Sequence, residues 1–184
     1  MAEFYAEGFL TRLLGLDTHG SLDGLVHTVL KEFTFYVVPN MCPDGSVRGH
    51  LRTNACGSNL NREWESTGIP GDEHYYKAPT MERSPEVLCV LKKMDETGVD
   101  AFLDVHGDEE LPYNFVNGAE GCPNWGPRLM HLQGAFVASY SRANPDIQPF
   151  SGYAPDEALK AKMTVCSNQI GTRFDCLAGT LEMP

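Results

Sequence analysis

The chain has 184 residues, of which 42% are hydrophobic, and a formal net charge of −11. A chain of this size and composition can bury the core of one globular domain, so we expect a single domain over residues 1–184. The acidic charge argues against nucleic acid or an anionic membrane as the main partner, because both are bound through clusters of Lys and Arg. No stretch approaches the roughly 20 apolar residues of a transmembrane helix, and the first residues lack the charge pattern of a signal peptide. We therefore expect a cytoplasmic protein.

The six cysteines are scattered along the chain and form no C-x-x-C pair. They are Cys42, Cys56, Cys89, Cys122, Cys166 and Cys176. Without that spacing a cysteine zinc site is not indicated, and without a secretory signal free thiols are favoured over disulfides.

The first third of the chain predicts two helices, a strand and a long loop. Apolar residues recur at helical spacing over residues 1–15, and a second short helix is expected over 22–31. No capping residue precedes the first helix, from which we expect Met1 not to be a natural domain start. Residues 33–38 are aromatic and β-branched, which predicts a strand that ends at Pro39. Residues 40–84 read mostly as a loop, with a turn at Pro43-Asp44-Gly45, and their concentration of polar and basic residues favours a functional role.

The rest of the chain alternates helices and strands. Ser84-Pro85-Glu86 has the composition of a helix start, and Gly98 ends that helix. Strands are expected over 101–107, around 113–116 and over 176–184, and helices over 127–143 and 167–174. This alternation predicts an α/β domain with three layers, αβα.

The segment at 101–109 reads as a buried strand that ends on His106 beside three carboxylates. Ligands of α/β sheets bind just beyond the carboxyl ends of the strands, so His106 lies where chemistry is expected. The alternative is a structural histidine whose ring is hydrogen-bonded by Asp104 or Asp108.

Three further sets of residues point to one kind of chemistry. They are Arg52, the pair Asn61-Arg62, and Glu182 on the last, otherwise apolar strand. A histidine can hold zinc, a nearby carboxylate can take a proton from zinc-bound water, and fixed arginines can bind a carboxylate and stabilise an oxyanion. Together these groups would suit hydrolysis of a peptide bond next to a free C-terminal carboxylate. For each taken alone, a solvated loop or a strand-end acid remains the alternative.

With these residues the chain resembles the zinc metallocarboxypeptidases, and among them the bacterial cytosolic-carboxypeptidase-like branch. Four segments carry the resemblance and occur in family order: Val38–Gly45, Arg52–Asn54 leading to Asn59–Trp64, Phe102–Glu109, and Thr180–Pro184. The resemblance implies a mixed, mostly parallel sheet between helices, one Zn²⁺ ion, and a peptide or protein C-terminus as substrate.

The resemblance also implies a role for each matching residue. His106 matches the third zinc ligand, and Glu182 matches the general base that acts through the zinc-bound water. Arg52 matches the arginine that polarises the scissile carbonyl. Asn61 and Arg62 match the pair that holds the C-terminal carboxylate of the substrate.

The chain also departs from the family pattern. The first two zinc ligands form an H-x-x-E motif that would lie upstream of Met1, so we expect a catalytic domain incomplete at both ends that binds zinc poorly and is inactive alone. Glu109 is not counted as a ligand, but strong zinc binding and activity of this chain alone would make Glu109 or another histidine, His50 or His74, a ligand. No motif of the chain matches the substrate-covering tyrosine of the family, for which Tyr153 is the candidate.

Two other functions stay open from the sequence. Aspartoacylase and succinylglutamate desuccinylase relatives share the zinc site and an Asn-Arg pair but cleave small N-acyl amino acids. A metal-free module could also keep Arg52 and Arg62 for binding carboxylates without catalysis.

Overall fold

The computed structural model describes residues 1–65 and 78–184. The expected long loop over 40–84 therefore falls partly outside the described residues, as does His74. The chain forms two compact units, Met1–Met41 and Cys42–Pro184.

The first unit contains two helices joined by a short turn. Helix α1 is Ala2–Leu14, a 3₁₀ turn follows at Leu16–Thr18, and α2 is Gly24–Glu32. Both helices were predicted from the sequence. Helix α1 has no side-chain cap, whereas the carboxylate of Asp23 caps α2 by accepting a hydrogen bond from the backbone N–H of Val26 at 2.9 Å. Arg12 of α1 donates to the same carboxylate at 2.9 Å, so one acid ties the two helices together.

The prediction of a strand over residues 33–38 is wrong. This segment is extended but pairs with no strand among the described residues. Aromatic and β-branched residues favour any surface on which they can pack, and a sheet is only one such surface. Here Phe35 packs edge-on against Phe9 of α1, with ring centroids 5.7 Å apart.

The turn predicted at Pro43-Asp44-Gly45 is instead the first turn of a short helix, α3, Pro43–Arg48. Proline suits the first helical position because its missing N–H would be unpaired there anyway. Gly45 is buried, and a Cβ at this position would lie 2.7 Å from Cys42 Sγ and 2.7 Å from the carbonyl oxygen of Thr53. Glycine is thus needed here because another part of the backbone approaches too closely for a side chain.

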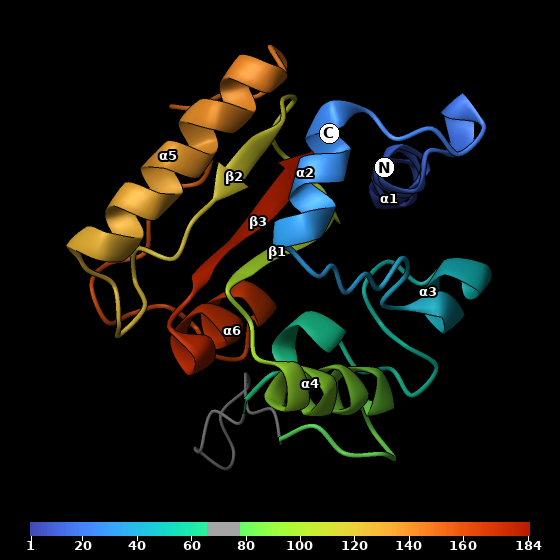
Figure 1. The fold of residues 1–184 in the computed structure, drawn as a ribbon. Helices are drawn as coiled ribbons and strands as arrows, with labels where there is room; N and C mark the ends of the chain where they lie inside the picture. Colours follow the sequence, from blue (N-terminus) through green and yellow to red (C-terminus); the bar gives the residue numbers. More distant parts are fainter. Residues whose placement is uncertain (66–77) are drawn as a thin grey trace. The chain divides into compact units, whose positions relative to one another are not determined.

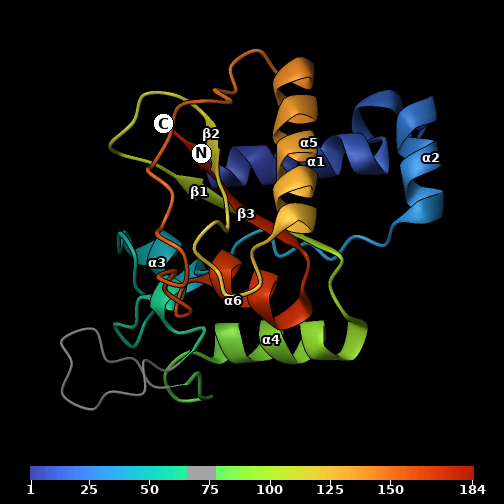
Figure 2. The same ribbon diagram turned by 90° about the vertical axis from the view of Figure 1, so that its left-hand side faces the viewer.

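Two helices of the second unit lie side by side below the sheet (Figures 1 and 2). Helix α4 is Pro85–Thr97 and α6 is Cys166–Phe174, both close to the predicted bounds. They are joined by Arg173 of α6, which donates two hydrogen bonds of 2.8 Å to the carboxylate of Asp95 on α4. Val87, Leu91 and Ile170 are buried residues of these helices.

Three strands form one mixed sheet in the order β1-β3-β2 (Figure 1). Strand β1 is Ala101–Gly107, β2 is Phe115–Asn117 and β3 is Leu177–Met183. Strand β3 runs parallel to β1 and antiparallel to β2. The predicted mixed α/β architecture is confirmed, with one parallel and one antiparallel pair among the described strands.

Helix α6 covers one face of this sheet. Ser167 Oγ lies 3.0 Å from Thr180 Oγ1, and a Cβ on Gly171 would lie 3.0 Å from that of Ala178. Successive side chains of a strand alternate between faces, so Glu182 points to the same side as Ala178 and Thr180. Helix α5, Pro127–Ala143, was predicted with these bounds and contacts β3.

All six cysteines are free thiols in the structure. Among residues 1–65 and 78–184, no helix has both the length and the apolar composition needed to cross a membrane.

Candidate active site

His106 is held by a carboxylate of its own strand. Its Nε2 lies 2.9 Å from Asp104 Oδ2. The two residues are two positions apart on β1, so both side chains point to the same face of the sheet. Burial lowers the pKa of His106, but the hydrogen bond to Asp104 and the charges of Asp104 and Glu182 outweigh it and raise that pKa above its usual value.

Glu182 lies directly opposite His106 on the neighbouring strand. The two residues are partners in the parallel register of β1 and β3, and Nδ1 of His106 is 4.0 Å from Oε1 of Glu182. Burial raises the pKa of Glu182, as do the charges of Asp108 and Asp104, against the opposing effect of His106 and Arg52. A carboxylate with a raised pKa is better suited to accept and return a proton near neutral pH.

Arg52 contributes positive charge to the same place. Its charge lowers the pKa of both His106 and Glu182, so the guanidinium lies within electrostatic reach of the strand pair. The sequence predicted this grouping although Arg52 and Glu182 are 130 positions apart.

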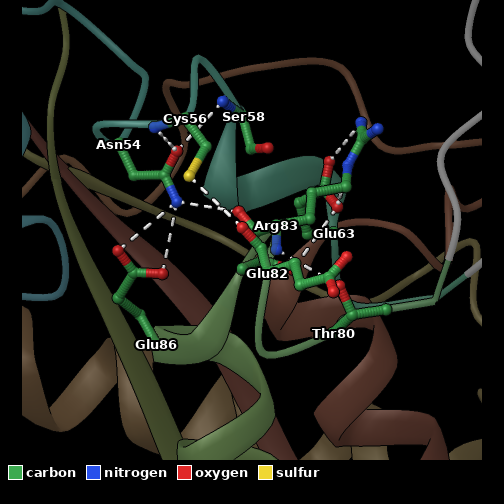
Figure 3. Close-up of polar contacts among 9 residues, drawn as sticks. Asn54, Cys56, Ser58, Glu63, Thr80, Glu82, Arg83 and Glu86 are labelled. Atoms are coloured by element: carbon green, nitrogen blue, oxygen red, sulfur yellow. Dashed lines mark hydrogen bonds and ion pairs between the residues drawn. The ribbon is translucent and has the colours of Figure 1, made fainter.

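The loop that follows Arg52 is organised by Asn54 (Figure 3). The side-chain oxygen of Asn54 accepts hydrogen bonds from the backbone N–H groups of Cys56 and Ser58, at 3.1 and 3.0 Å. Its side-chain nitrogen donates to the carbonyl oxygen of Arg83 at 2.9 Å. A bridge between Thr53 and Asn59 closes the loop, which gives the arginine a fixed base.

Asn61 and Arg62 lie in a short 3₁₀ turn, Leu60–Arg62, with buried residues on both sides. These buried neighbours are Leu60, Glu63 and Trp64. The side-chain oxygen of Asn61 accepts a hydrogen bond of 2.8 Å from the backbone N–H of Cys166, the first residue of α6. Because that bond uses the oxygen, the amide nitrogen of Asn61 is the group suited to bind a carboxylate. Nη1 of Arg62 donates to the carbonyl oxygen of Asn61 at 2.7 Å.

Cys166 connects this turn to the strand pair. Burial raises the pKa of its thiol strongly, and the charge of Asp104 adds to the effect. Cys166 is thus within electrostatic reach of the carboxylate that holds His106, while its backbone holds Asn61. The start of α6 therefore links the Asn61-Arg62 turn to the strand pair that carries His106 and Glu182.

Tyr153, the candidate for the substrate-covering tyrosine, is paired with Asp108, a contact that the sequence did not predict. The hydroxyl of Tyr153 donates a hydrogen bond of 2.6 Å to Oδ1 of Asp108. That bond raises the pKa of Tyr153, and burial and the charges of Asp108 and Glu182 raise it further, so the phenol lies near Glu182. Its ring also packs edge-on against Phe115, the register partner of Glu182 on β2. Position 153 lies in an irregular stretch, where no periodicity could have indicated this contact.

Beside Tyr153 there is a pocket of about 180 Å³. It is lined by Asn117, Gly118, Glu120, Gly121, Tyr153, Ala154 and Asp156. Gly121 lets the chain approach closely, because a Cβ there would lie 2.4 Å from Cβ of Asp156.

His106 has the orientation expected of a zinc ligand. A ligating histidine usually gives its second nitrogen to a carboxylate, as Nε2 does to Asp104, and this leaves Nδ1 facing Glu182 for a metal. Within the described part of the chain, however, no group of three His, Cys, Asp or Glu side chains could hold a metal ion. His106 therefore fits one position of a zinc site, and neither Glu109 nor His50 joins it in such a group.

Comparison with known proteins gives close matches in sequence and structure. A metallo-carboxypeptidase from Burkholderia cenocepacia is 43% identical and superposes with a TM-score of 0.87 over 99% of this chain, which covers 44% of that protein. A metallo-carboxypeptidase from Pseudomonas aeruginosa, solved in complex with (2-guanidinoethylmercapto)succinic acid, is 44% identical with a TM-score of 0.70 and is matched by 81% of this chain, over 36% of its own length. The human cytosolic carboxypeptidase-like protein 5 is 40% identical over 63 residues, which are 34% of this chain and 6% of that protein.

The chain thus spans less than half the length of each of these proteins. The zinc carboxypeptidase family matches residues 17–164, which are most of the chain. This chain belongs to the zinc carboxypeptidase family.

Proposed function

We propose that this chain contributes to the active site of a zinc-dependent carboxypeptidase that removes C-terminal residues from peptides or proteins. In this proposal both compact units belong to one catalytic domain, and the protein acts in the cytoplasm without nucleic acid or membrane as a partner. The observation that carries the proposal is the pairing of His106 with Glu182 across parallel strands, within reach of the charge of Arg52.

Substrate binding would begin with the C-terminal carboxylate. Arg62 and the amide nitrogen of Asn61 supply donors for it, and a guanidinium can bind a carboxylate through two parallel hydrogen bonds. The neighbour from P. aeruginosa supports this, because its ligand is a succinic acid derivative. Arg52 would then polarise the scissile carbonyl and stabilise the oxyanion that forms on it.

Proton transfer would be carried out by Glu182. Its raised pKa suits a group that takes a proton from the attacking water and passes it to the amine that leaves. Zinc, when bound, supplies a Lewis acid that makes water a stronger nucleophile at neutral pH. His106 would be one ligand of that zinc, with its ring fixed by Asp104.

Two alternatives have less support. An aspartoacylase-like amidohydrolase would share the Asn-Arg pair and the zinc site, but the family that matches is that of the zinc carboxypeptidases, and a similar solved structure is a metallo-carboxypeptidase. A metal-free carboxylate-binding module would use the arginines but would have no need for the Glu182 carboxylate facing Nδ1 of His106.

The proposal is tested with Glu182→Gln. We expect this variant, made in a zinc-loaded protein that contains residues 1–184, to lose at least 100-fold in release of C-terminal amino acids, the scale of one general acid-base group. The variant should still bind (2-guanidinoethylmercapto)succinic acid, because the carboxylate-binding donors are untouched. A peptide with an amidated C-terminus is the control substrate and should be cleaved poorly by the unchanged protein. Equal activity of Glu182→Gln and the unchanged protein would contradict the proposal.

The 184-residue chain by itself should bind zinc weakly and release no C-terminal amino acid. Catalytic zinc takes about three protein ligands, and His106 is the one assigned here. Zinc affinity can be measured by competition with a chromogenic chelator. Micromolar or tighter binding that survives His106→Ala would show that the metal is held elsewhere.

A further inference from the structure

We infer that Arg83 is a positioning residue that fixes Arg52 and the Asn61-Arg62 pair relative to each other. This inference rests on the proposed function, because it assigns a role in the same site. Arg83 lies just before α4 and is separated in the sequence from the residues that it would position (Figure 3).

The first contact of Arg83 is with Glu63, the residue after Arg62. Nε of Arg83 donates a hydrogen bond of 2.8 Å to Oε2 of Glu63, and Nη2 donates one of 2.8 Å to Oε1. The side chain of Glu63 is completely buried, whereas that of Arg83 is 39% exposed. A buried carboxylate needs such a partner, so the guanidinium determines where Glu63 and the preceding turn can lie.

The second contact of Arg83 is with the loop after Arg52. Its carbonyl oxygen accepts a hydrogen bond of 2.9 Å from the side chain of Asn54, two residues beyond Arg52. Asn54 is itself 2% exposed, and its side-chain nitrogen also lies 3.4 and 3.3 Å from the two carboxylate oxygens of Glu86, so the carbonyl oxygen of Arg83 is its shorter contact. The side chain of Arg83 thus fixes the Asn61-Arg62 turn while its backbone fixes the base of Arg52.

A purely structural ion pair would not need this arrangement. Replacing a buried ion pair by apolar side chains is often neutral for stability. Stability alone therefore does not explain the bidentate contact between Arg83 and Glu63. Arg173 and Asp95 form an equally short pair, with both bonds at 2.8 Å, that joins α4 to α6. That pair is more exposed, with side chains 41% and 45% accessible, and serves as the control for the loss of an arginine–carboxylate pair at a helix of the same unit.

The main test variant is the double substitution Glu63→Met/Arg83→Met, which removes the pair without leaving a buried charge. We expect it to unfold in urea at nearly the midpoint of the unchanged chain but to bind (2-guanidinoethylmercapto)succinic acid about tenfold more weakly, since a shift of about 1 Å in a positioning group can cost that much or more. Hydrogen exchange of the amides of residues 52–62 should become faster. Arg173→Met should change neither the affinity for the ligand nor the hydrogen exchange of residues 52–62.

Arg83→Lys distinguishes position from charge. Lysine keeps the positive charge beside Glu63 but cannot form the bidentate contact. The stability of this variant should therefore stay closer to that of the unchanged chain than its ligand affinity does. If the double variant does not fold, Glu63→Gln replaces it, because the amide keeps one acceptor for Arg83 and the same shape.

The outcomes separate the inference from the proposed function. If the unchanged chain does not bind the succinic acid derivative, the proposed carboxylate site fails and hydrogen exchange of residues 52–62 alone decides the role of Arg83. A folded double variant with unchanged affinity and unchanged exchange would overturn the inference. Equal losses in the double variant and in Arg173→Met would overturn it as well, because the effect would then be general destabilisation.

Discussion

At the scale of single residues, Asn61 has one contact that the structure shows and one role that we propose, at opposite ends of its side chain. Its oxygen accepts a hydrogen bond from the first backbone N–H of α6, a group that has no partner within its own helix. No side chain next to α6 caps it, so Asn61 acts as a cap from a distant part of the sequence. Its nitrogen is the end assigned to the substrate carboxylate.

Two substitutions separate the Asn61 contact from the proposed role. We expect Asn61→Ala to lower the free energy of unfolding by about 1 kcal/mol, the usual cost of losing a helix cap. Asn61→Asp should keep the stability, because a carboxylate also accepts from the Cys166 N–H and is favourable near a helix N-terminus. Its negative charge should nevertheless abolish binding of a carboxylate ligand. Urea unfolding and calorimetric titration measure the two effects, and a stable Asn61→Asp variant that binds normally would contradict the assignment.

The sequence indicates His106 and Glu182, the residues proposed to react, but not the residues that contact the loops around them. His106 and Glu182 each interrupt an apolar strand, which a single sequence can reveal. Arg83 shows no such signal, because its contacts with Asn54 and Glu63 depend on how the loop returns to α4. Tyr153 is similar, since its partner Asp108 lies 45 positions away.

At the scale of elements, helices α4 and α6 contact the strands and loops that carry the candidate site. Helix α6 contacts β1 and β3 and holds Asn61, and α4 begins at the network of Arg83. The helices were predictable because their apolar spacing and terminal residues are local features. The strand expected at 33–38 was not, because composition does not tell whether a partner strand is adjacent.

The Arg173–Asp95 pair between these helices should contribute little. Its side chains are 41% and 45% exposed, and exposed ion pairs are typically worth about 0–1 kcal/mol. The hydrogen bond from Arg173 lowers the pKa of Asp95 below the ordinary value of 3.8, against a smaller effect of burial. The small contribution is therefore present above 3.8 and is lost as the pH falls through the lowered pKa.

The change to test is Arg173→Met, compared with the unchanged chain by urea unfolding. A difference of no more than about 1 kcal/mol is expected at pH 7, shrinking in acid and in high salt. A larger difference that persists in acid would mean that the Arg173 stem, and not its charge, holds α4 to α6.

At the scale of the whole molecule, the thiols report on how the chain is folded. Cys56 and Cys89 are exposed, whereas Cys122, Cys166 and Cys176 are buried. Burial raises the pKa of Cys176 to about 11 and also raises those of Cys122 and Cys166. Thiolates are the reactive form, so both access and ionisation protect these three.

Labelling with a thiol-specific disulfide reagent at pH 8 should therefore modify Cys56 and Cys89 within minutes. Cys122, Cys166 and Cys176 should react only after urea is added, and peptide mass spectrometry identifies each site. Cys56→Ser and Cys89→Ser are the controls and should each remove one fast-reacting thiol. Fast labelling of Cys166 in the native chain would mean that the start of α6 is not packed as described.

The parallel register of β1 and β3 has a consequence for how this chain tolerates change in length. His106 faces Glu182 because the two strands are aligned residue by residue from Ala101 with Leu177 to Gly107 with Met183. Deleting or inserting one residue in β3 before Glu182 would turn its carboxylate to the opposite side of the sheet, where it could not reach the histidine. A point substitution in this strand can reduce the proposed activity by a small or a large amount. A single-codon insertion or deletion before Glu182 would remove that activity. Changes in the length of this chain should therefore be confined to its loops.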